Sequence, residues 1–109
     1  MTKCRLLVAM TTCADDESAE RLARGLVENR LAACVSVGSP VLSVYPWQGE
    51  IHADKEVPLT IKTAPDRVAA LKDFIAKHHG YDVPELLIVP VTDGADSYLQ
   101  WAEDWMKND

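Results

Sequence analysis

The sequence predicts an α+β fold, and three observations indicate it. Segments typical of strands alternate along the chain with segments whose apolar residues recur at helical spacing. Apolar residues make up 48% of the chain and charged residues 26%, which is the ordinary balance of a globular protein. The length of 109 residues, without internal repeats or low-complexity tracts, suits one domain with a modest core. We therefore expect a single domain over residues 1–109.

The first strand and the first helix are predicted between residues 4 and 29. Residues 4–12 are apolar with little alternation, which is typical of a central strand. Asp15 or Asp16 can cap the helix that follows, and Asn29 suits its end. The predicted buried stripe of this helix consists of Ala19, Leu22, Ala23, Leu26 and Val27.

The middle of the chain predicts further strands. One strand is expected over residues 31–37, and after an interruption it resumes over 41–45. Residues 46–49 (P-W-Q-G) predict a turn or bulge. Over residues 56–63 apolar and polar side chains alternate, which indicates a strand with one buried face. Pro58 within it lacks an N–H, so we expect it at an edge or a bulge.

A second helix, a last strand and a terminal helix complete the predicted elements. Thr63 as a cap, followed by an early proline, predicts the start of the second helix, and Gly80 predicts its end. Residues 86–91 are expected to form the last core strand. Asp96 and Ser97 suit the start of a terminal helix that carries Tyr98, Trp101, Ala102 and Trp105 on one side.

This order of elements is β-α-β-β-α-β with an additional C-terminal helix. Two right-handed βα units give a four-stranded sheet with helices on one face, which is the ferredoxin-like sandwich. The residues expected in its core share one periodicity: Leu6, Val8, Leu22, Leu26, Leu59, Ile61, Leu71, Ile75, Ile88 and Val91.

Charge and cysteine content restrict the function. The net charge of −6 repels phosphate backbones, so we expect no nucleic-acid partner. No apolar run approaches the roughly 20 residues that span a bilayer, so no membrane partner is expected either. The N-terminal apolar segment is too short for a signal peptide, which makes a cytoplasmic location the default. Cys4, Cys13 and Cys34 are too widely spaced for a structural zinc site.

The stretch from residue 77 to 94 concentrates chemically active side chains. Two imidazoles, a phenol and two carboxylates lie between His78 and Glu85. His78 and His79 are candidate metal ligands, because imidazole binds copper and zinc at neutral pH. Alternatively, His78 ends the buried stripe and His79 stabilises the helix C-terminus. Glu85 is a candidate ligand or a partner of an imidazole; otherwise it is an ordinary polar loop residue.

Cys13 is a further candidate ligand. It follows a buried strand and precedes a helix, where the helix dipole favours a thiolate. Its alternative role is that of a small apolar core residue. Motifs typical of enzymes are absent, including the Walker loop, the nucleotide-binding glycine fingerprint, H-E-x-x-H and G-x-S-x-G, so we do not expect an enzyme.

Six motifs together resemble the CutA family of divalent-cation tolerance proteins. They are T-T-C at 11–13, L-A-A-C at 31–34, Y-x-W-x-G-E-I at 45–51, I-K-T at 61–63, H-x-Y-D-V-P-E at 79–85 and P-V-T-D-G at 90–94. The resemblance implies a ferredoxin-like fold, a tight homotrimer whose strands pair across subunits, and a role in metal tolerance with copper binding. Its fold is similar to that of PII-type signalling proteins, which raises a small-ligand sensor as an alternative.

One departure from the family concerns the metal. Some members have a cysteine, a suggested copper ligand, where this chain has Thr11, and the nearest thiol here is Cys13. We hypothesise a site for copper or another divalent metal at His78, His79, Cys13 and Glu85. A third hypothesis is a scaffold whose main property is a stable trimer.

Large aromatic side chains predict the interface. Trp47 lies in a predicted turn beside Tyr45, where a lone tryptophan would be exposed unless the hairpin folds it onto its own sheet. Trp101 and Trp105 are expected to dock the terminal helix, either locally or on a neighbouring subunit. The homotrimer implied by the resemblance favours an interface role for Tyr45 and Trp47.

Overall fold

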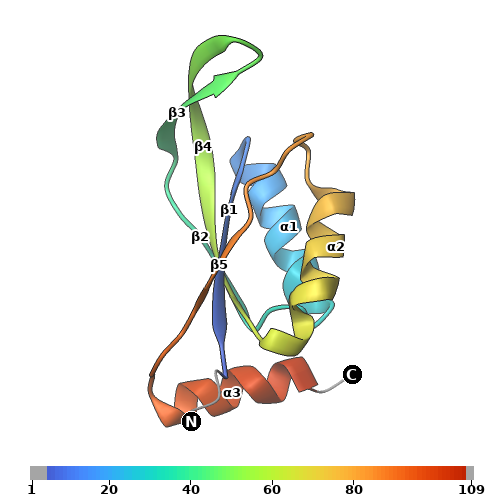
Figure 1. Cartoon of the computed structure of the whole chain (residues 1–109). Helices are drawn as coiled ribbons and strands as arrows, with labels where there is room; N and C mark the ends of the chain where they lie inside the picture. Colours follow the sequence, from blue (N-terminus) through green and yellow to red (C-terminus); the bar gives the residue numbers. More distant parts are fainter. Residues whose placement is uncertain (1–4, 108–109) are drawn as a thin grey trace.

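A five-stranded antiparallel sheet forms the centre of the computed structural model, which describes residues 5–107 (Figure 1). Its strands are β1 (Leu7–Cys13), β2 (Cys34–Val37), β3 (Val41–Trp47), β4 (Glu50–Thr63) and β5 (Leu87–Pro90). The order across the sheet is β2-β4-β1-β5, and β3 pairs with the first part of β4. The predicted ferredoxin-like arrangement is confirmed, with β2 and β3 as two parts of one interrupted strand. Cys4, part of the first predicted strand, lies outside the described residues.

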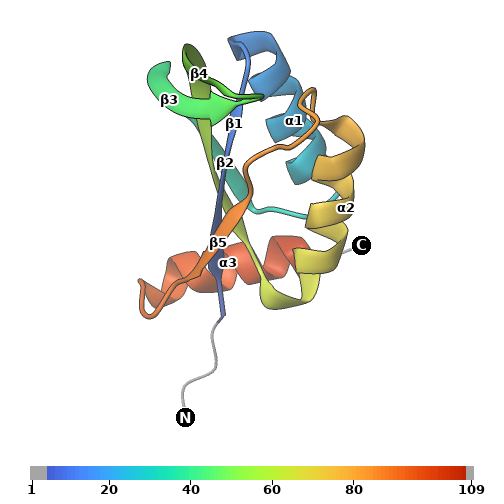
Figure 2. The ribbon, with the colours of Figure 1, turned by 45° about the horizontal axis from the view of Figure 1, so that its top comes forward.

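Three α-helices pack around this sheet. They are α1 (Asp16–Glu28), α2 (Val68–His78) and α3 (Asp96–Lys107), and a short 3-10 turn, η1 (Pro65–Arg67), precedes α2. Helices α1 and α2 cover one face of the sheet, and α3 lies across its lower end (Figure 2). The other face, which we call the open face, is covered by neither α1 nor α2. None of the helices within residues 5–107 has the length and apolar character that crossing a bilayer requires.

Local signals at both ends of α1 explain why it forms where it was predicted. The Asp15 carboxylate accepts a hydrogen bond from the Ser18 backbone N–H at 2.8 Å, so it caps the helix. At the other end the backbone N–H of Arg30 binds the Val27 carbonyl and that of Leu31 binds the Leu26 carbonyl, which is a Schellman motif. Arg30 has φ 58°, a left-handed conformation that glycine usually occupies.

The main core lies between the sheet and helices α1 and α2. Seven of the ten predicted core residues are buried: Leu6, Leu22, Leu26, Leu59, Ile61, Leu71 and Ile75. Val8, Ile88 and Val91 are only half-buried. β5 is an edge strand, so its open-face residues Leu87 and Val89 are 56% and 43% exposed, and the prediction that residues 86–91 form a core strand is wrong for this face.

The β3–β4 hairpin is longer than predicted and projects beyond the rest of the molecule (Figure 1). β4 begins at Glu50, six residues before the expected start at Glu56. Gln48 and Gly49 form the two-residue turn with φ 51° and 81°, as a type I′ hairpin requires. Pro46 and Trp47, expected in the turn, instead pair with Ile51 and Glu50.

Pro58 occupies an interior strand, not an edge. β4 lies between β1 and β2, and Pro58 is opposite Thr12 of β1. Its carbonyl accepts the Gly38 N–H at 2.9 Å, so its missing N–H faces the same side, where β2 has ended and β3 has not begun. The proline therefore removes no ladder bond to β1.

Thr63 does not cap the second helix, and that prediction is wrong. It is the last residue of β4, is fully buried, and donates its hydroxyl to the Leu31 carbonyl at 2.7 Å. Ala64 precedes the 3-10 turn that leads into α2, and no side chain caps that turn. The second helix ends at His78, with His79 in an extended conformation, so it stops before Gly80.

Helix α3 is rotated relative to the prediction. Its buried residues are Leu99, Ala102 and Met106, which join Leu6, Ala33 and Ala64 in a second, smaller core. The Trp105 indole N–H donates to the Val27 carbonyl at 3.1 Å, and the Arg30 guanidinium lies 3.7 Å from the centre of the Trp105 ring. Trp105 thus docks α3 on the end of α1.

Candidate functional site

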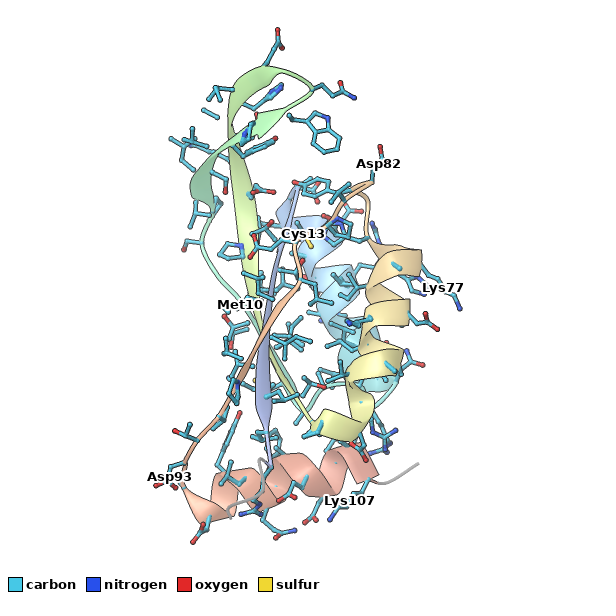
Figure 3. All side chains as sticks on the ribbon, in the orientation of Figure 1. Met10, Cys13, Lys77, Asp82, Asp93 and Lys107 are labelled. Atoms are coloured by element: carbon cyan, nitrogen blue, oxygen red, sulfur yellow. The ribbon has the colours of Figure 1, made fainter. Side chains whose placement is uncertain are left out.

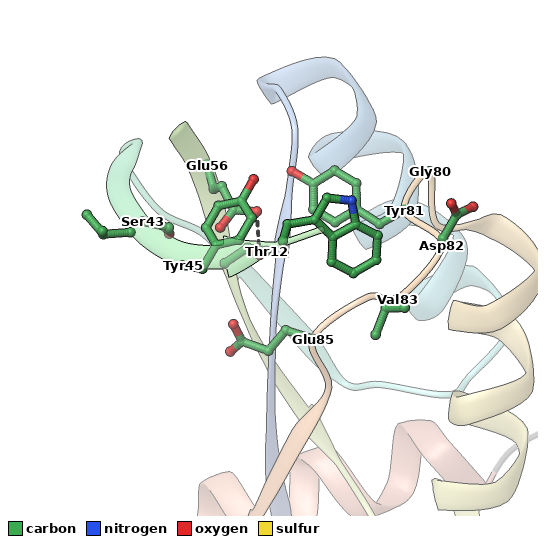
Figure 4. Close-up of a pocket in the computed structure, with 11 residues that line it drawn as sticks. Thr12, Ser43, Tyr45, Glu56, Gly80, Tyr81, Asp82, Val83 and Glu85 are labelled. Carbon is green, nitrogen blue, oxygen red and sulfur yellow. Dashed lines mark hydrogen bonds between the residues drawn. The ribbon is translucent and has the colours of Figure 1, made fainter. Parts of the chain in front are cut away.

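A cavity of about 670 Å³ lies at the end of the sheet where the hairpin projects (Figure 4). Residues from four segments line it: the end of β1, strand β3, strand β4 and the loop from residue 80 to 85. We call it the apical pocket and define it by Thr12, Tyr45, Trp47, Glu56, Tyr81 and Glu85.

The pairing of the strands puts Thr12 and Glu56 together on the open face. Cys13 is opposite Val57, and both are buried beneath the helices, so their neighbours Thr12 and Glu56 point the other way. The Thr12 hydroxyl donates to the Glu56 carboxylate at 3.0 Å. Burial, followed by hydrogen bonding to Glu56 and its charge, raises the pKa of the Tyr81 hydroxyl. The base of the pocket is therefore negatively charged, with a neutral phenol beside it.

Tyr45 is oriented by its neighbours on the hairpin. Its hydroxyl donates a hydrogen bond to Asp54, which raises the pKa of that hydroxyl. Its ring stacks on His52 of the paired strand, with ring centres 5.7 Å apart. The ring is 37% exposed, so one part of it remains available on the pocket side.

His79 holds the loop of the pocket against β1. Its Nδ1 accepts the Tyr81 backbone N–H at 3.1 Å, so the proton of the neutral ring is on Nε2. That nitrogen lies 2.7 Å from the Thr12 carbonyl and donates to it. The His79 and Tyr81 rings are also in contact, with centres 4.9 Å apart. Both imidazole nitrogens are thus engaged in fixing the loop, and ligation of a metal requires one of these bonds to break.

His78 lies away from the pocket. It is exposed at the end of α2 and packs against Phe74, with ring centres 4.2 Å apart. It lines a second, smaller hollow between α1 and α2 instead. The alternative in which His78 ends the buried stripe is wrong, because the helix turns this side chain to solvent.

Cys13 lies on the helix side of the sheet, at the end of β1 (Figure 3). Burial raises the pKa of its thiol, and the charges of Asp15 and Glu56 add to that shift. Thr11, where some family members have a cysteine, lies two residues earlier in the strand and is also buried. The side chains of Thr11 and Cys13 therefore point to the same face of the sheet. The structure therefore gives Cys13 the properties of a protonated core thiol.

The four predicted metal ligands do not come together in one chain. Glu85 lies on the rim of the open-face pocket, and Cys13 is buried beneath the opposite face. Within residues 5–107, no group of three or more His, Cys, Asp and Glu side chains could hold a metal ion. The described part of a single chain thus does not provide a fitting ligand set for copper or another divalent ion.

The predicted interface residues differ in exposure. Tyr45 and Trp47 are 37% and 42% exposed, and Trp101 is 53% exposed beside Tyr98. Trp105 is half-buried within its own chain. Apolar side chains on the hairpin and on the strands at the sheet edges extend the exposed apolar surface: Val37, Val41, Leu42, Val44, Ile51, Leu87 and Val89.

Sequence reasoning missed Thr12 and Glu56 as pocket residues. Glu56 begins the alternating run, so its side chain is expected on the face of the strand that does not carry Val57. The local sequence does not indicate which residues lie near Glu56 on that face. Its neighbours depend on the β1–β4 register, which pairs Thr12 with Pro58. Tyr81 lies within the stretch from residue 77 to 94 that concentrates chemically active side chains, although it is not one of the predicted ligands.

The sequence matches the family described as "CutA1 divalent ion tolerance protein" over residues 7–105. "Protein CutA homolog" of Xenopus laevis is 42% identical over 99 residues, which cover 91% of this chain and 66% of that protein. "Divalent-cation tolerance protein CutA" of Pectobacterium atrosepticum is 41% identical over 98 residues, covering 90% of this chain and 89% of that protein.

Solved structures agree with this match. The crystal structure of CutA1 from the psychrotrophic bacterium Shewanella sp. SIB1 has a TM-score of 0.90 and 39% identity, covering 95% of this chain and 97% of that one. This chain spans 52–66% of the length of the vertebrate and plant relatives that it matches, one of which is "Protein CutA, chloroplastic" of Arabidopsis thaliana.

Proposed function

The chain belongs to the CutA1 divalent ion tolerance family, and we propose that it acts without catalysis in divalent-cation tolerance, as a homotrimer that binds copper or another divalent ion. The observation that carries the proposal is the projecting hairpin, whose apolar side chains are largely exposed in the described part of the chain. Leu42 and Val44 of β3 are 64% and 65% exposed, and Ile51 of β4 is 74% exposed. Apolar surface of this extent typically marks an interface.

The free edges of the sheet support assembly through strands. β3 pairs only with β4 among the described residues, and β5 pairs only with β1. Unpaired strand edges are templates for another chain, and oligomers use them to satisfy backbone groups. Three copies in a closed ring would cover both the edges and the exposed apolar side chains.

The metal part of the proposal requires the assembly. Within one chain, Glu56, Asp82 and Glu85 supply carboxylates to the same pocket, but no group of three or more His, Cys, Asp and Glu side chains within residues 5–107 could hold a metal ion. We propose that a neighbouring copy completes the set beside the hairpin. His79 and Cys13 could join only after a change of conformation, because His79 is engaged at both nitrogens and Cys13 faces the core.

Light scattering and copper titration test the two parts separately. We expect the mass of three chains at micromolar concentration, and a monomer would contradict the assembly. Glu85→Gln should weaken copper binding, whereas Asp73→Asn, which removes the same charge from the exposed surface of α2, should not. Equal copper affinity in both variants and the parent would place the metal outside the apical pocket. A double variant, His78→Ala with His79→Ala, tests the imidazoles in the same way.

A small-ligand sensor is the second candidate, and the size of the apical pocket favours it. A volume of about 670 Å³ is within the range of sites for small organic molecules and exceeds the needs of an ion.

We propose the cytoplasm as the compartment, because Cys13 and Cys34 are both free thiols, as in a reducing environment. Cell fractionation would test that location directly.

A further inference from the structure

We infer that the apical pocket accepts a small organic cation, an alkylammonium group, between aromatic rings and carboxylates. This inference rests on the proposed function in one respect only, namely that both use the same pocket. It names a class of ligand that a sensor with this site would detect. The class follows from the rings, the charges and the volume of the pocket.

Three aromatic rings from separate segments line the pocket. Tyr45 and Trp47 come from β3, and Tyr81 comes from the loop that follows α2. Tyr45 is fixed by its hydrogen bond to Asp54 and Tyr81 by its contacts with His79. The faces of aromatic rings attract cations, and several rings around one space are the usual device for binding an ammonium group.

The charges of the pocket are all of one sign. Glu56, Asp82 and Glu85 line it, whereas no Lys, Arg or His side chain is found among its lining residues (Figure 4). None of the ion pairs within residues 5–107 involves these carboxylates. These carboxylates are therefore available to pair with a bound cation.

Size and donor geometry favour an organic cation over a bare metal ion. A divalent metal needs several oxygen, nitrogen or sulfur atoms at bonding distance, and within residues 5–107 of one chain no group of three His, Cys, Asp or Glu side chains could hold it. An alkylammonium ion needs apolar contact over its methyl or methylene groups and a diffuse negative charge. Tyr45, Trp47 and Val83 supply the contact, and the carboxylates supply the charge.

The experiment compares choline with its uncharged isostere 3,3-dimethylbutan-1-ol by isothermal titration calorimetry on the purified full chain. The two molecules have nearly the same shape and differ in charge, so the comparison isolates recognition of the cation. We expect choline to bind at least about tenfold more tightly than the alcohol, as rings and carboxylates acting together should allow. Equal affinity for both, or no binding of choline at millimolar concentration, would overturn the inference.

Two variants locate the binding. Tyr81→Leu removes one ring, and Glu85→Gln removes one charge at the exposed rim; each should weaken choline binding about fivefold or more. Asp73→Asn serves as the matched control and should leave the affinity unchanged. A loss with Asp73→Asn equal to that with Glu85→Gln would show general surface attraction and contradict a site. The trimer mass and the copper titration are read independently, so the proposed function can fail while this inference holds, and the reverse.

Discussion

The same substitution at two buried threonines should change stability in opposite directions. Thr11 and Thr63 are 1% and 0% exposed and lie in neighbouring strands of the sheet. The Thr63 hydroxyl donates to the Leu31 carbonyl, whereas the Thr11 hydroxyl has no hydrogen-bond partner among the described residues. Valine has nearly the shape of threonine, so Thr11→Val and Thr63→Val differ mainly in whether the lost hydroxyl had a hydrogen-bond partner.

The magnitudes follow from the cost of an unsatisfied buried polar group. Removing the Thr11 hydroxyl relieves a desolvation penalty of about 1–3 kcal/mol, so we expect Thr11→Val to stabilise the fold by roughly 1 kcal/mol or more. Thr63→Val breaks a bond and leaves the Leu31 carbonyl short of a partner, which should cost about 1–3 kcal/mol. The two variants should therefore differ by roughly 2 kcal/mol or more.

Urea denaturation followed by circular dichroism measures this difference. All proteins are compared at one protomer concentration, because assembly makes stability concentration-dependent. The urea concentration at the midpoint of unfolding should rise for Thr11→Val and fall for Thr63→Val. The dependence of the unfolding free energy on urea concentration should change little. If both variants shift the midpoint in the same direction by a similar amount, the assignment of a partner to one hydroxyl and none to the other is refuted.

Three further predictions concern the hairpin, the terminal helix and the buried thiol. Gly49 has φ 81°, so Gly49→Val should cost about 1–2 kcal/mol in the turn. It should weaken assembly, measured by gel filtration, more than it weakens the fold of the core, measured by urea denaturation. Trp105→Ala should destabilise the chain by about 2–4 kcal/mol and Trp101→Ala by less than about 1 kcal/mol, since only Trp105 docks on α1; similar losses in urea melts would contradict that docking. Because the pKa of Cys13 is raised above its ordinary 9.0, its contribution to stability is complete at lower pH and is lost as the pH rises past that value. Parent stability should therefore fall relative to Cys13→Ala above pH 9.0, and a constant difference in melts from pH 7 to 10.5 would disprove the burial of the thiol.

The predictable parts of the fold are those with local signals. Helix α1 has a capping carboxylate at Asp15, an apolar stripe and a terminating Asn29, and the structure ends it within one residue of the expectation. The early part of β4 had no such signal. Ile51, Ala53 and Lys55 are exposed, so this segment has no buried face and its strand exists only through pairing with β3. Periodicity cannot detect a strand that packs against nothing in its own chain.

Thr63 shows how tertiary contacts override a local signal. Threonine before Ala-Pro-Asp is a good cap in isolation, but the strand brings the residue under the Leu31 carbonyl, where its hydroxyl has a better-buried partner. Helix α3 illustrates the same point, because its rotation is set by the space beside Leu6 and Ala33 and not by its aromatic content.

The candidate site depended on registers that the sequence does not contain. That the end of β1 lies near the entry to β5 follows from the antiparallel pairing of first and last strands, and Met10 does pair with Leu87. Whether a side chain at that end faces the helices or the open face depends on the phase of the alternation. That phase separates Cys13 from Glu85, and it brings Glu56 beside Thr12 and within reach of Tyr81.

Native mass spectrometry of the protein purified without added metal tests the central claim most directly, because it reports the number of chains and what they carry. We predict a trimer that retains a cation, either a divalent metal or an organic ammonium ion, and that loses it when Glu56 and Glu85 are both changed to glutamine. A single chain without a bound species, or a bound species that survives in this double variant, would contradict the account.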